Sequence, residues 1–306
     1  MTDEAIRTER LSKHFGRTVA LEGLDLEVPR GEIFGFLGPN GAGKSTTIRL
    51  LLNLIRPTSG RAWIMGVPVG DVRAAHRHLG YVPGDVALWP QLTGMEILTY
   101  LGRLSGRVDT AYRDELIERL RLDPSLRARS YSKGNRQKVA LVAAFMTRPD
   151  LLLLDEPTAG LDPLMEAEFQ ALTREAARRG QTVFLSSHIL AEVEDVCERV
   201  GILRDGRLIE VATLADLRGL NATVYDATLD GPAPDLSDVP GVASVEPLPD
   251  GVRVTLTGPP GPLLERLAGT GLVKLRSHEP SLEEVFMTYY ESPARPETGL
   301  TARLDR

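Results

Sequence analysis

The segment from Gly38 to Ser45 combines glycines, a lysine and a serine in a spacing that suits phosphate chemistry, reading Gly38-Pro39-Asn40-Gly41-Ala42-Gly43-Lys44-Ser45. This is the pattern G-x-x-x-x-G-K-[ST]. Its glycines let successive backbone N–H groups converge on an anion, because no Cβ blocks the approach. Lys44 can reach the β- and γ-phosphates as a point charge, and the Ser45 hydroxyl can ligate Mg²⁺. Together with Thr46, the segment predicts a site for a nucleoside triphosphate and Mg²⁺.

A strand and a helix must flank such a loop to hold it in place. Residues 32–37 read as a buried strand. An apolar-periodic helix is expected from about Lys44 to Leu54, and its N-terminal donors and dipole would also face the anion. A chance match to the pattern in a chain of this length has odds of roughly one in a hundred. The flanking strand and helix make a chance match less probable still, so we predict triphosphate binding.

Two further strand ends carry side chains that suit ATP hydrolysis. Asp155 and Glu156 follow the apolar run 151–154, at the end of a strand where open α/β sheets bind ligands. Asp155 suits holding Mg²⁺, and Glu156 suits activating the attacking water. His188 follows the strand expected at 182–186, where it can hydrogen-bond a γ-phosphate. Paired acids could instead be solvated or cap a helix, and a lone histidine is more often a helix-start or core residue.

Composition limits the classes of partner and site. The net charge is −6 and the pI is near 5.5, which argues against general nucleic-acid binding. The single cysteine, Cys197, excludes intrachain disulfides and a Cys-based metal cluster, and it fits a reducing cytoplasm. No stretch reaches the roughly 18 apolar residues that a membrane span needs. Any membrane part is therefore expected from a partner.

The order of the expected elements predicts an α/β fold in two parts. Strands alternate with helices along residues 1–218, which indicates one domain with a mostly parallel sheet and helices on both sides, and residues 95–127 have helical periodicity. Short strands and one helix then indicate a small α+β domain at 219–291, whose last helix begins with a capping box at Ser281. We expect residues 292–306 to form a disordered tail.

Several motifs together resemble the ATP-binding-cassette (ABC) ATPases, and their order and spacing match over residues 4–218. They are Tyr131-Ser132-Lys133-Gly134-Asn135, the run from Leu151 to Pro157, Gly160-Leu161-Asp162 and Ser187-His188. The resemblance implies a P-loop domain with a mixed sheet core, an antiparallel β subdomain and a helical subdomain at about 90–148. It also implies a head-to-tail homodimer that encloses two ATP molecules, a self-complementary arrangement. Each glycine loop would then face Ser132 and Gly134 of the other subunit, with Asp162 near the shared interface. Phe15 matches the aromatic residue that stacks on adenine in this family, the alternative being an ordinary core phenylalanine.

Two positions depart from the family pattern. The signature usually reads Leu-Ser-Gly-Gly-Gln, and here Lys133 adds a positive charge within it. The family's glutamine that contacts Mg²⁺ and water should fall in the segment 81–85, where this chain has Gly84. We hypothesise that Asp85 or water takes over that role, with slower or more permease-dependent hydrolysis.

The C-terminal part narrows the resemblance. Pro280-Ser281-Leu282-Glu283-Glu284-Val285-Phe286 is similar to the C-terminal motif of ATPases that drive two-component drug and antibiotic exporters of the ABC-2, daunorubicin-resistance-like group; it reads equally as an amphipathic helix. The implied protein is the ATPase subunit of a drug or hydrophobic-cargo exporter, bound from the cytoplasm to the inner face of the membrane through a separate integral permease. Residues 88–90, around Trp89, are a candidate docking surface, unless Trp89 folds inward. The alternative function is a regulatory cassette ATPase that acts on a soluble partner.

Overall fold

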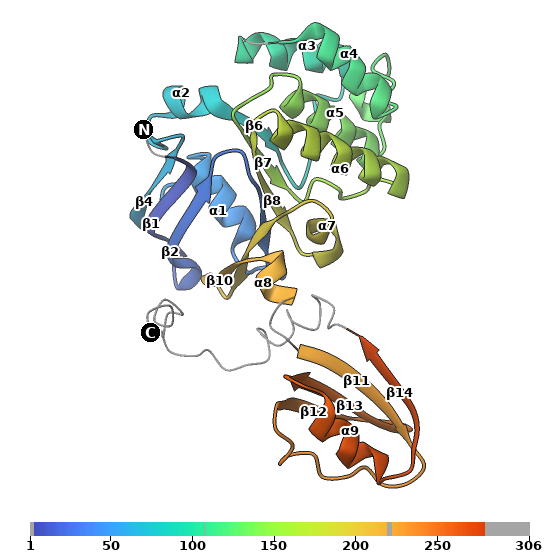
Figure 1. Cartoon of the computed structure of the whole chain (residues 1–306). Coiled ribbons are helices and arrows are strands. Elements are labelled where there is room, and N and C mark those ends of the chain that lie inside the picture. The colour runs from blue at the N-terminus through green and yellow to red at the C-terminus, as the bar shows by residue number, and fades with distance from the viewer. Residues whose placement is uncertain (1–2, 107, 219–221, 279–306) are drawn as a thin grey trace. The chain divides into compact units, whose positions relative to one another are not determined.

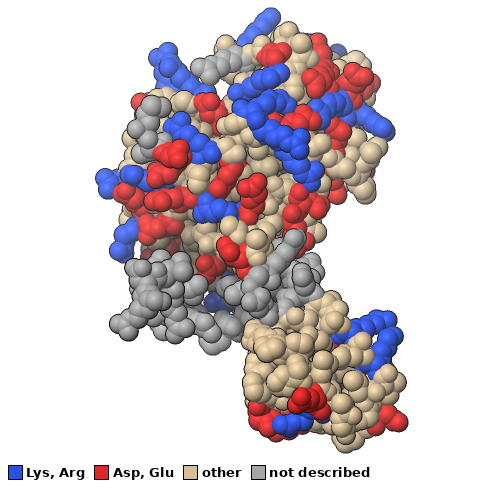
Figure 2. Space-filling view, viewed as in Figure 1, with Lys and Arg blue, Asp and Glu red and all other residues tan. Residues whose placement is uncertain are grey.

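The computed structural model describes residues 3–106, 108–218 and 222–278. The chain divides into two compact units, Met1–Ala212 and Thr213–Arg306. The capping box expected at Ser281 and the tail expected at 292–306 lie outside the described residues. Figure 1 shows the elements of each unit, and Figure 2 shows basic and acidic side chains mixed over the visible face of the larger unit.

A six-stranded sheet forms the centre of the larger unit. Its strand order is β10-β9-β3-β8-β7-β6, with β3 (Ile33–Leu37), β6 (Leu79–Val82), β7 (Leu151–Asp155), β8 (Thr182–Ser187), β9 (Arg199–Arg204) and β10 (Arg207–Thr213). The pairs β3–β8, β3–β9, β6–β7 and β7–β8 are parallel. β3, β7 and β8 are buried along their whole length, because elements cover both faces of a parallel sheet. The sheet confirms the predicted fold class.

A second, antiparallel sheet supplies the other wall of the core. Its order is β2-β1-β4-β5, with β1 (Glu4–Phe15), β2 (Thr18–Pro29), β4 (Ser59–Ile64) and β5 (Val67–Pro68). Helix α1 (Lys44–Leu51) packs against both sheets, contacting β2 and β4 on one side and β7 on the other (Figure 1). Its apolar residues Ile48, Leu50 and Leu51 are fully buried in this shared core. This packing fixes the start of α1, where the glycine loop ends.

The remaining helices of the larger unit lie mostly beyond the edge strand β6 or across the central sheet (Figure 1). They are α2 (Val72–Ala75), α3 (Gly94–Ser105), α4 (Thr110–Arg119), α5 (Lys133–Phe145), α6 (Pro163–Arg178) and α7 (Leu190–Glu194). Helical periodicity was expected over 95–127, but α3 ends at Ser105 and α4 ends at Arg119. Gly106 adopts a left-handed conformation that terminates α3, and Arg121 has φ 49°, which a continuing helix does not allow. None of the described helices is long and apolar enough to span a membrane.

An ionic cluster joins α4 to α6. The Arg119 guanidinium binds Glu168 Oε1 at 2.6 Å and both carboxylate oxygens of Glu175 at 2.8 and 2.9 Å. These hydrogen bonds hold the pKa of the Glu175 carboxyl below its ordinary value and raise that of Arg119. Because Asp162 caps the start of α6, the cluster connects α4 to the segment that follows Glu156.

The smaller unit is an antiparallel sheet covered by one helix. It contains α8 (Leu214–Arg218), β11 (Ala222–Leu229), β12 (Val242–Leu248), β13 (Gly251–Thr257), α9 (Gly261–Ala268) and β14 (Leu272–His278), with strand order β12-β13-β11-β14. The order is that of a ferredoxin-like split βαβ fold in which a loop replaces the first helix. Val252, Val254 and Leu256 of β13 face Leu263 and Leu267 of α9 in a separate core.

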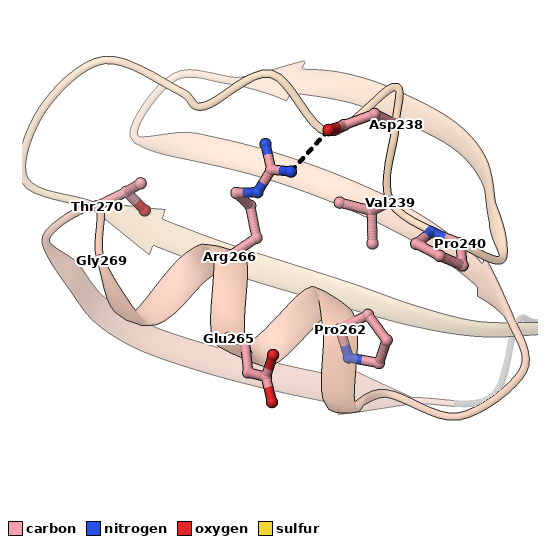
Figure 3. A pocket seen from close by; sticks show the side chains of 8 residues that line it. All are labelled: Asp238, Val239, Pro240, Pro262, Glu265, Arg266, Gly269 and Thr270. Carbon is pink, nitrogen blue, oxygen red and sulfur yellow. Dashed lines mark hydrogen bonds and ion pairs between the residues drawn. The ribbon is translucent and has the colours of Figure 1, made fainter.

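A groove of about 580 Å³ lies between α9 and the loop that precedes β12 (Figure 3). Arg266 is the cation that lines it, and its guanidinium is bound to Asp238 Oδ2 at 2.7 Å and to the Asp235 carbonyl at 3.1 Å. Glu265, on the same helix turn, adds a second acid to the lining. The cation is thus already neutralised, so we assign no anion site to this groove.

Candidate nucleotide site

The glycine loop between β3 and α1 has the backbone that its sequence predicts. Gly43 caps α1 with φ 111°, and a Cβ there would lie 2.6 Å from the Ala20 carbonyl oxygen. At Gly38, a Cβ would lie 2.5 Å from the Leu203 carbonyl oxygen. Any larger residue would displace the loop at both positions, because real Cβ atoms do not approach backbone oxygens so closely. The first and last glycines of the loop therefore fix its path between β2 and β9.

Lys44 is held inside the loop. Its Nζ atom donates hydrogen bonds to the carbonyls of Gly38 at 2.5 Å and Pro39 at 3.1 Å, and its side chain is only 4% exposed. Burial lowers the pKa of Lys44, while the nearby carboxylates of Glu156 and Asp155 oppose this shift. A desolvated cation whose ion pair with Glu156 Oε1 is as long as 4.0 Å gains strongly from an arriving anion, because Coulomb energies are larger where water is excluded. Lys44 is thus placed to bind phosphate.

Asp155 ends β7 with its carboxylate buried. Its Oδ1 atom accepts a hydrogen bond from the Ser186 hydroxyl at 2.5 Å, which fixes the carboxylate beside the loop. Among the described residues, no three His, Cys, Asp or Glu side chains gather to hold a metal ion by themselves. A hydroxyl from Ser45 and one carboxylate suit Mg²⁺, which keeps several waters and shares its remaining ligands with phosphates. The donor set therefore fits a Mg²⁺ that arrives with its nucleotide.

Glu156 and His188 lie side by side at the ends of β7 and β8. His188 Nδ1 is 3.1 Å from Glu156 Oε1, and Lys44 Nζ is 4.0 Å from the same oxygen. His188 is 43% exposed, so it is no core residue. Glu156 adopts φ 47°, a left-handed conformation that is rare for a residue with a side chain, and its N–H is held by the Ser186 carbonyl at 3.1 Å. Strain of this kind concentrates at functional sites.

Glu192 of α7 is a site residue that the sequence did not reveal. Its Oε2 atom accepts from the Ser187 hydroxyl at 2.6 Å, and its Oε1 atom accepts from the Thr158 hydroxyl at 2.7 Å. Glu192 therefore joins the segment before His188 to the segment after Glu156. Nothing in the local sequence predicts the bridge, because its partner Thr158 is 34 residues away.

Phe15 stands at the tip of the β1–β2 hairpin with its side chain exposed, so the alternative of a core phenylalanine is wrong. The hairpin is tied to the glycine loop through Gly206, the turn between β9 and β10. The Gly206 N–H donates to the Ala42 carbonyl at 3.0 Å, and the Glu22 N–H donates to the Gly206 carbonyl at 2.7 Å. Phe15 therefore belongs to a hairpin whose position relative to the phosphate-binding loop is fixed.

Known proteins resemble this chain in sequence and in fold. The ABC transporter family matches residues 21–159. The daunorubicin resistance ATP-binding protein DrrA3 of Streptomyces coeruleorubidus is 35% identical over 310 residues, covering 94% of this chain and 96% of DrrA3. This chain belongs to the ABC transporter ATP-binding proteins. An ABC transporter ATP-binding protein of Nostoc is 38% identical over 216 residues, which cover 68% of this chain and 64% of that protein, just under two thirds of its length. A solved ATP-binding subunit of an ABC transporter superposes with a TM-score of 0.66 at 34% identity, covering 70% of this chain and 92% of that subunit.

The ABC signature segment, residues 131–135, contacts the segment that follows Glu156 in the same chain. Ser132 caps α5 by accepting the Asn135 N–H at 3.2 Å. A Cβ on Gly134 would lie 2.4 Å from the Gly160 carbonyl oxygen, so the two backbones are in contact. Asp162, two residues further on, caps α6 by accepting the N–H groups of Leu164 and Met165. Ser132, Gly134 and Asp162 thus form one group, and Lys44, Asp155, Glu156 and His188 form another.

The position of the missing ABC glutamine lies beside the carboxylate that suits Mg²⁺. A Cβ on Gly84 would lie 3.4 Å from the Asp155 carbonyl oxygen and 3.6 Å from Asp155 Oδ2, which are ordinary contact distances. Asp85, the next residue, is exposed. The structure therefore has room for a Cβ atom at position 84, directly beside Asp155.

Proposed function

We propose that this ABC ATPase is the ATP-hydrolysing subunit of a drug or antibiotic exporter that works with a separate integral membrane permease of the ABC-2 type. The observation that carries the proposal is the placement of Glu156 between Lys44 and His188 at the mouth of the glycine loop. A water-activating carboxylate beside two phosphate-binding groups is what hydrolysis of a γ-phosphate needs. In this proposal, ATP binds with Mg²⁺, which Ser45 and Asp155 hold.

Each side chain has a separate part in the proposed reaction. Lys44 neutralises phosphate charge, and the loop amides from Gly38 to Thr46 cradle the phosphates. Glu156 orients and deprotonates the attacking water, while His188 contacts the γ-phosphate. Phe15 stacks on the adenine base.

A homodimer completes the proposed site. Ser132, Gly134 and Asp162 form a group of their own around Gly160, with Ser132 exposed at the start of α5. In a head-to-tail C2 dimer, this group on each subunit would face the glycine loop of the other. The proposal accounts for two groups of family residues in one chain.

An exposed aromatic pair supports a docking surface for the permease. Trp89 and Tyr100 are each 48% exposed and meet edge to face with ring centroids 5.4 Å apart. Leu104, one helix turn beyond Tyr100 on α3, is 66% exposed. Exposed aromatic side chains of this kind are enriched in protein interfaces. Docking there would hold the subunit at the inner face of the membrane, and the name of DrrA3 supports drug cargo.

The test uses the full chain, alone and co-expressed with a polytopic membrane protein encoded beside it. Wild-type protein should hydrolyse Mg-ATP, and Glu156→Gln should abolish turnover and trap an ATP-bound dimer, measured by size-exclusion chromatography with multi-angle scattering. Co-purification with the membrane protein, reduced by Trp89→Ala, is expected. If the chain hydrolyses ATP normally yet stays monomeric, the dimer mechanism is wrong. Capture of the chain by a soluble partner instead would favour a regulatory ATPase.

A further inference from the structure

A lysine covers one face of the exposed aromatic ring of Phe15. Lys13 Nζ lies 4.8 Å from the centroid of the Phe15 ring, within the range of a cation–π contact. Lys13 and Phe15 are two residues apart on β1, so their side chains leave the strand on the same face. The strand therefore places the two side chains where this contact can form.

The ammonium group is tethered where it lies. Lys13 Nζ donates a hydrogen bond to the Arg56 carbonyl at 2.8 Å, in the segment that follows α1. The neighbouring residue His14 donates its backbone N–H to the Thr58 hydroxyl at 2.9 Å, and its side chain is 3.0 Å from Glu22. These contacts hold in place the two residues that precede Phe15.

We propose that Lys13 is a positioning residue for the nucleobase. By occupying one face of the Phe15 ring, Lys13 holds the ring still and leaves the other face for a purine base. The positive charge also draws π-electron density toward itself, which favours stacking of an electron-rich base on the opposite face. The proposal rests on the proposed ATP site and extends it from Phe15 to a residue that the sequence motifs do not assign.

A simpler effect has to be separated from this one. Lys13 is a cation near a polyanion, so its removal can weaken binding through long-range attraction alone. Such attraction acts on phosphates whether or not a base is attached. Inorganic tripolyphosphate carries the phosphates without a base, and it therefore isolates the electrostatic part. Arg17 is an exposed cation in the turn of the same hairpin, and Arg17→Met provides a matched loss of charge.

The experiment measures Kd for ATP and for tripolyphosphate, both with Mg²⁺, on the full-length wild type, Lys13→Met, Phe15→Leu, the double variant and Arg17→Met. Lys13→Met should weaken ATP binding by about two- to fivefold, the size of an exposed cation–π contact, and leave tripolyphosphate unchanged. In the Phe15→Leu background, Lys13→Met should have no further effect. Arg17→Met should bind ATP and tripolyphosphate as the wild type does.

The outcomes separate this inference from the proposed function. Equal losses for ATP and tripolyphosphate, an undiminished loss in the Phe15→Leu background, or no loss at all would overturn the role of Lys13. If Phe15→Leu weakens ATP binding but Lys13→Met does not, Phe15 remains a base platform and only the present inference fails. If Phe15→Leu leaves the Kd for ATP unchanged, the base site of the proposed function is wrong, and the role of Lys13 is wrong with it.

Discussion

Replacing Gly84 by alanine should stabilise the larger unit, although glycines in this fold mostly resist substitution. The φ angle of Gly84 lies outside the left-handed range, and its new Cβ would meet Asp155 atoms at 3.4 to 3.7 Å, which is ordinary contact. The alanine therefore adds no strain to the folded state and restricts the unfolded chain. We expect a gain of about 0.4–1 kcal/mol, which is roughly 1–4 °C in Tm for a unit of this size.

Gly80 offers a matched control four residues earlier. It lies on β6, and a Cβ there would lie 2.6 Å from the Ala144 carbonyl oxygen and 2.9 Å from both Leu152 Cδ2 and Pro149 Cγ. A backbone oxygen cannot move aside as a flexible side chain can, so overpacking is forced. Gly80→Ala should lose about 1–3 kcal/mol.

Tryptophan fluorescence during urea unfolding measures both variants in the relevant unit. The two tryptophans, Trp63 and Trp89, both belong to Met1–Ala212, so the signal reports that unit alone. A change in midpoint at constant slope would give the change in the free energy of unfolding. Destabilisation by Gly84→Ala, or tolerance of Gly80→Ala, would refute the steric argument, because the contacts of the added Cβ predict opposite changes in the free energy of unfolding for the two variants.

The remaining predictions concern turnover and the α4–α6 cluster. Gly84→Gln should raise basal ATPase turnover by about 2- to 10-fold, the worth of one hydrogen bond near Asp155, measured by phosphate release; unchanged turnover would mean that water already serves there. Arg119→Met should lower the free energy of unfolding by about 1 kcal/mol at neutral pH. Arg119 holds the pKa of Glu175 below its ordinary value. The stabilisation by this ion pair is therefore fully present when the pH is above the ordinary pKa of a glutamate, and it is lost as the pH falls through the lowered pKa of Glu175. If the free energies of unfolding of Arg119→Met and wild type still differ at pH 3, the ionised carboxylate of Glu175 is not the cause of the difference.

The sequence predicts what is local and periodic. The glycine loop follows from a spacing within eight residues, and β3, β7 and β8 follow from short apolar runs that are buried along their whole length. Helical periodicity over 95–127 was misleading, because Leu122 is buried although it lies beyond the end of α4. An apolar residue at a helical spacing indicates that its position is buried, but it does not show whether the backbone there is helical.

Contacts between distant polar residues leave no such pattern. Glu192 bridges Thr158 and Ser187, and Arg119 reaches Glu175 across 56 positions. Each of these side chains is common on solvated helix surfaces, so its type alone carries no information about its partner. The family resemblance predicts the groups that suit phosphate chemistry, whereas the hydrogen bonds that hold those groups in place are seen only in the folded chain.

Glu156 contacts the same two side chains that we propose to bind phosphate, so phosphate binding would free its carboxylate from them. Its left-handed backbone costs about 1 kcal/mol, and it aims the carboxylate at His188 at 3.1 Å and Lys44 at 4.0 Å. These two groups are the ones that we propose to bind the γ-phosphate. An arriving phosphate would compete for both and would leave Glu156 with fewer donors beside it. Both contacts are made to Oε1 of Glu156, so the arriving phosphate would free this oxygen to accept a hydrogen bond from the attacking water. Binding of the phosphate and activation of the base would then result from the same exchange of partners.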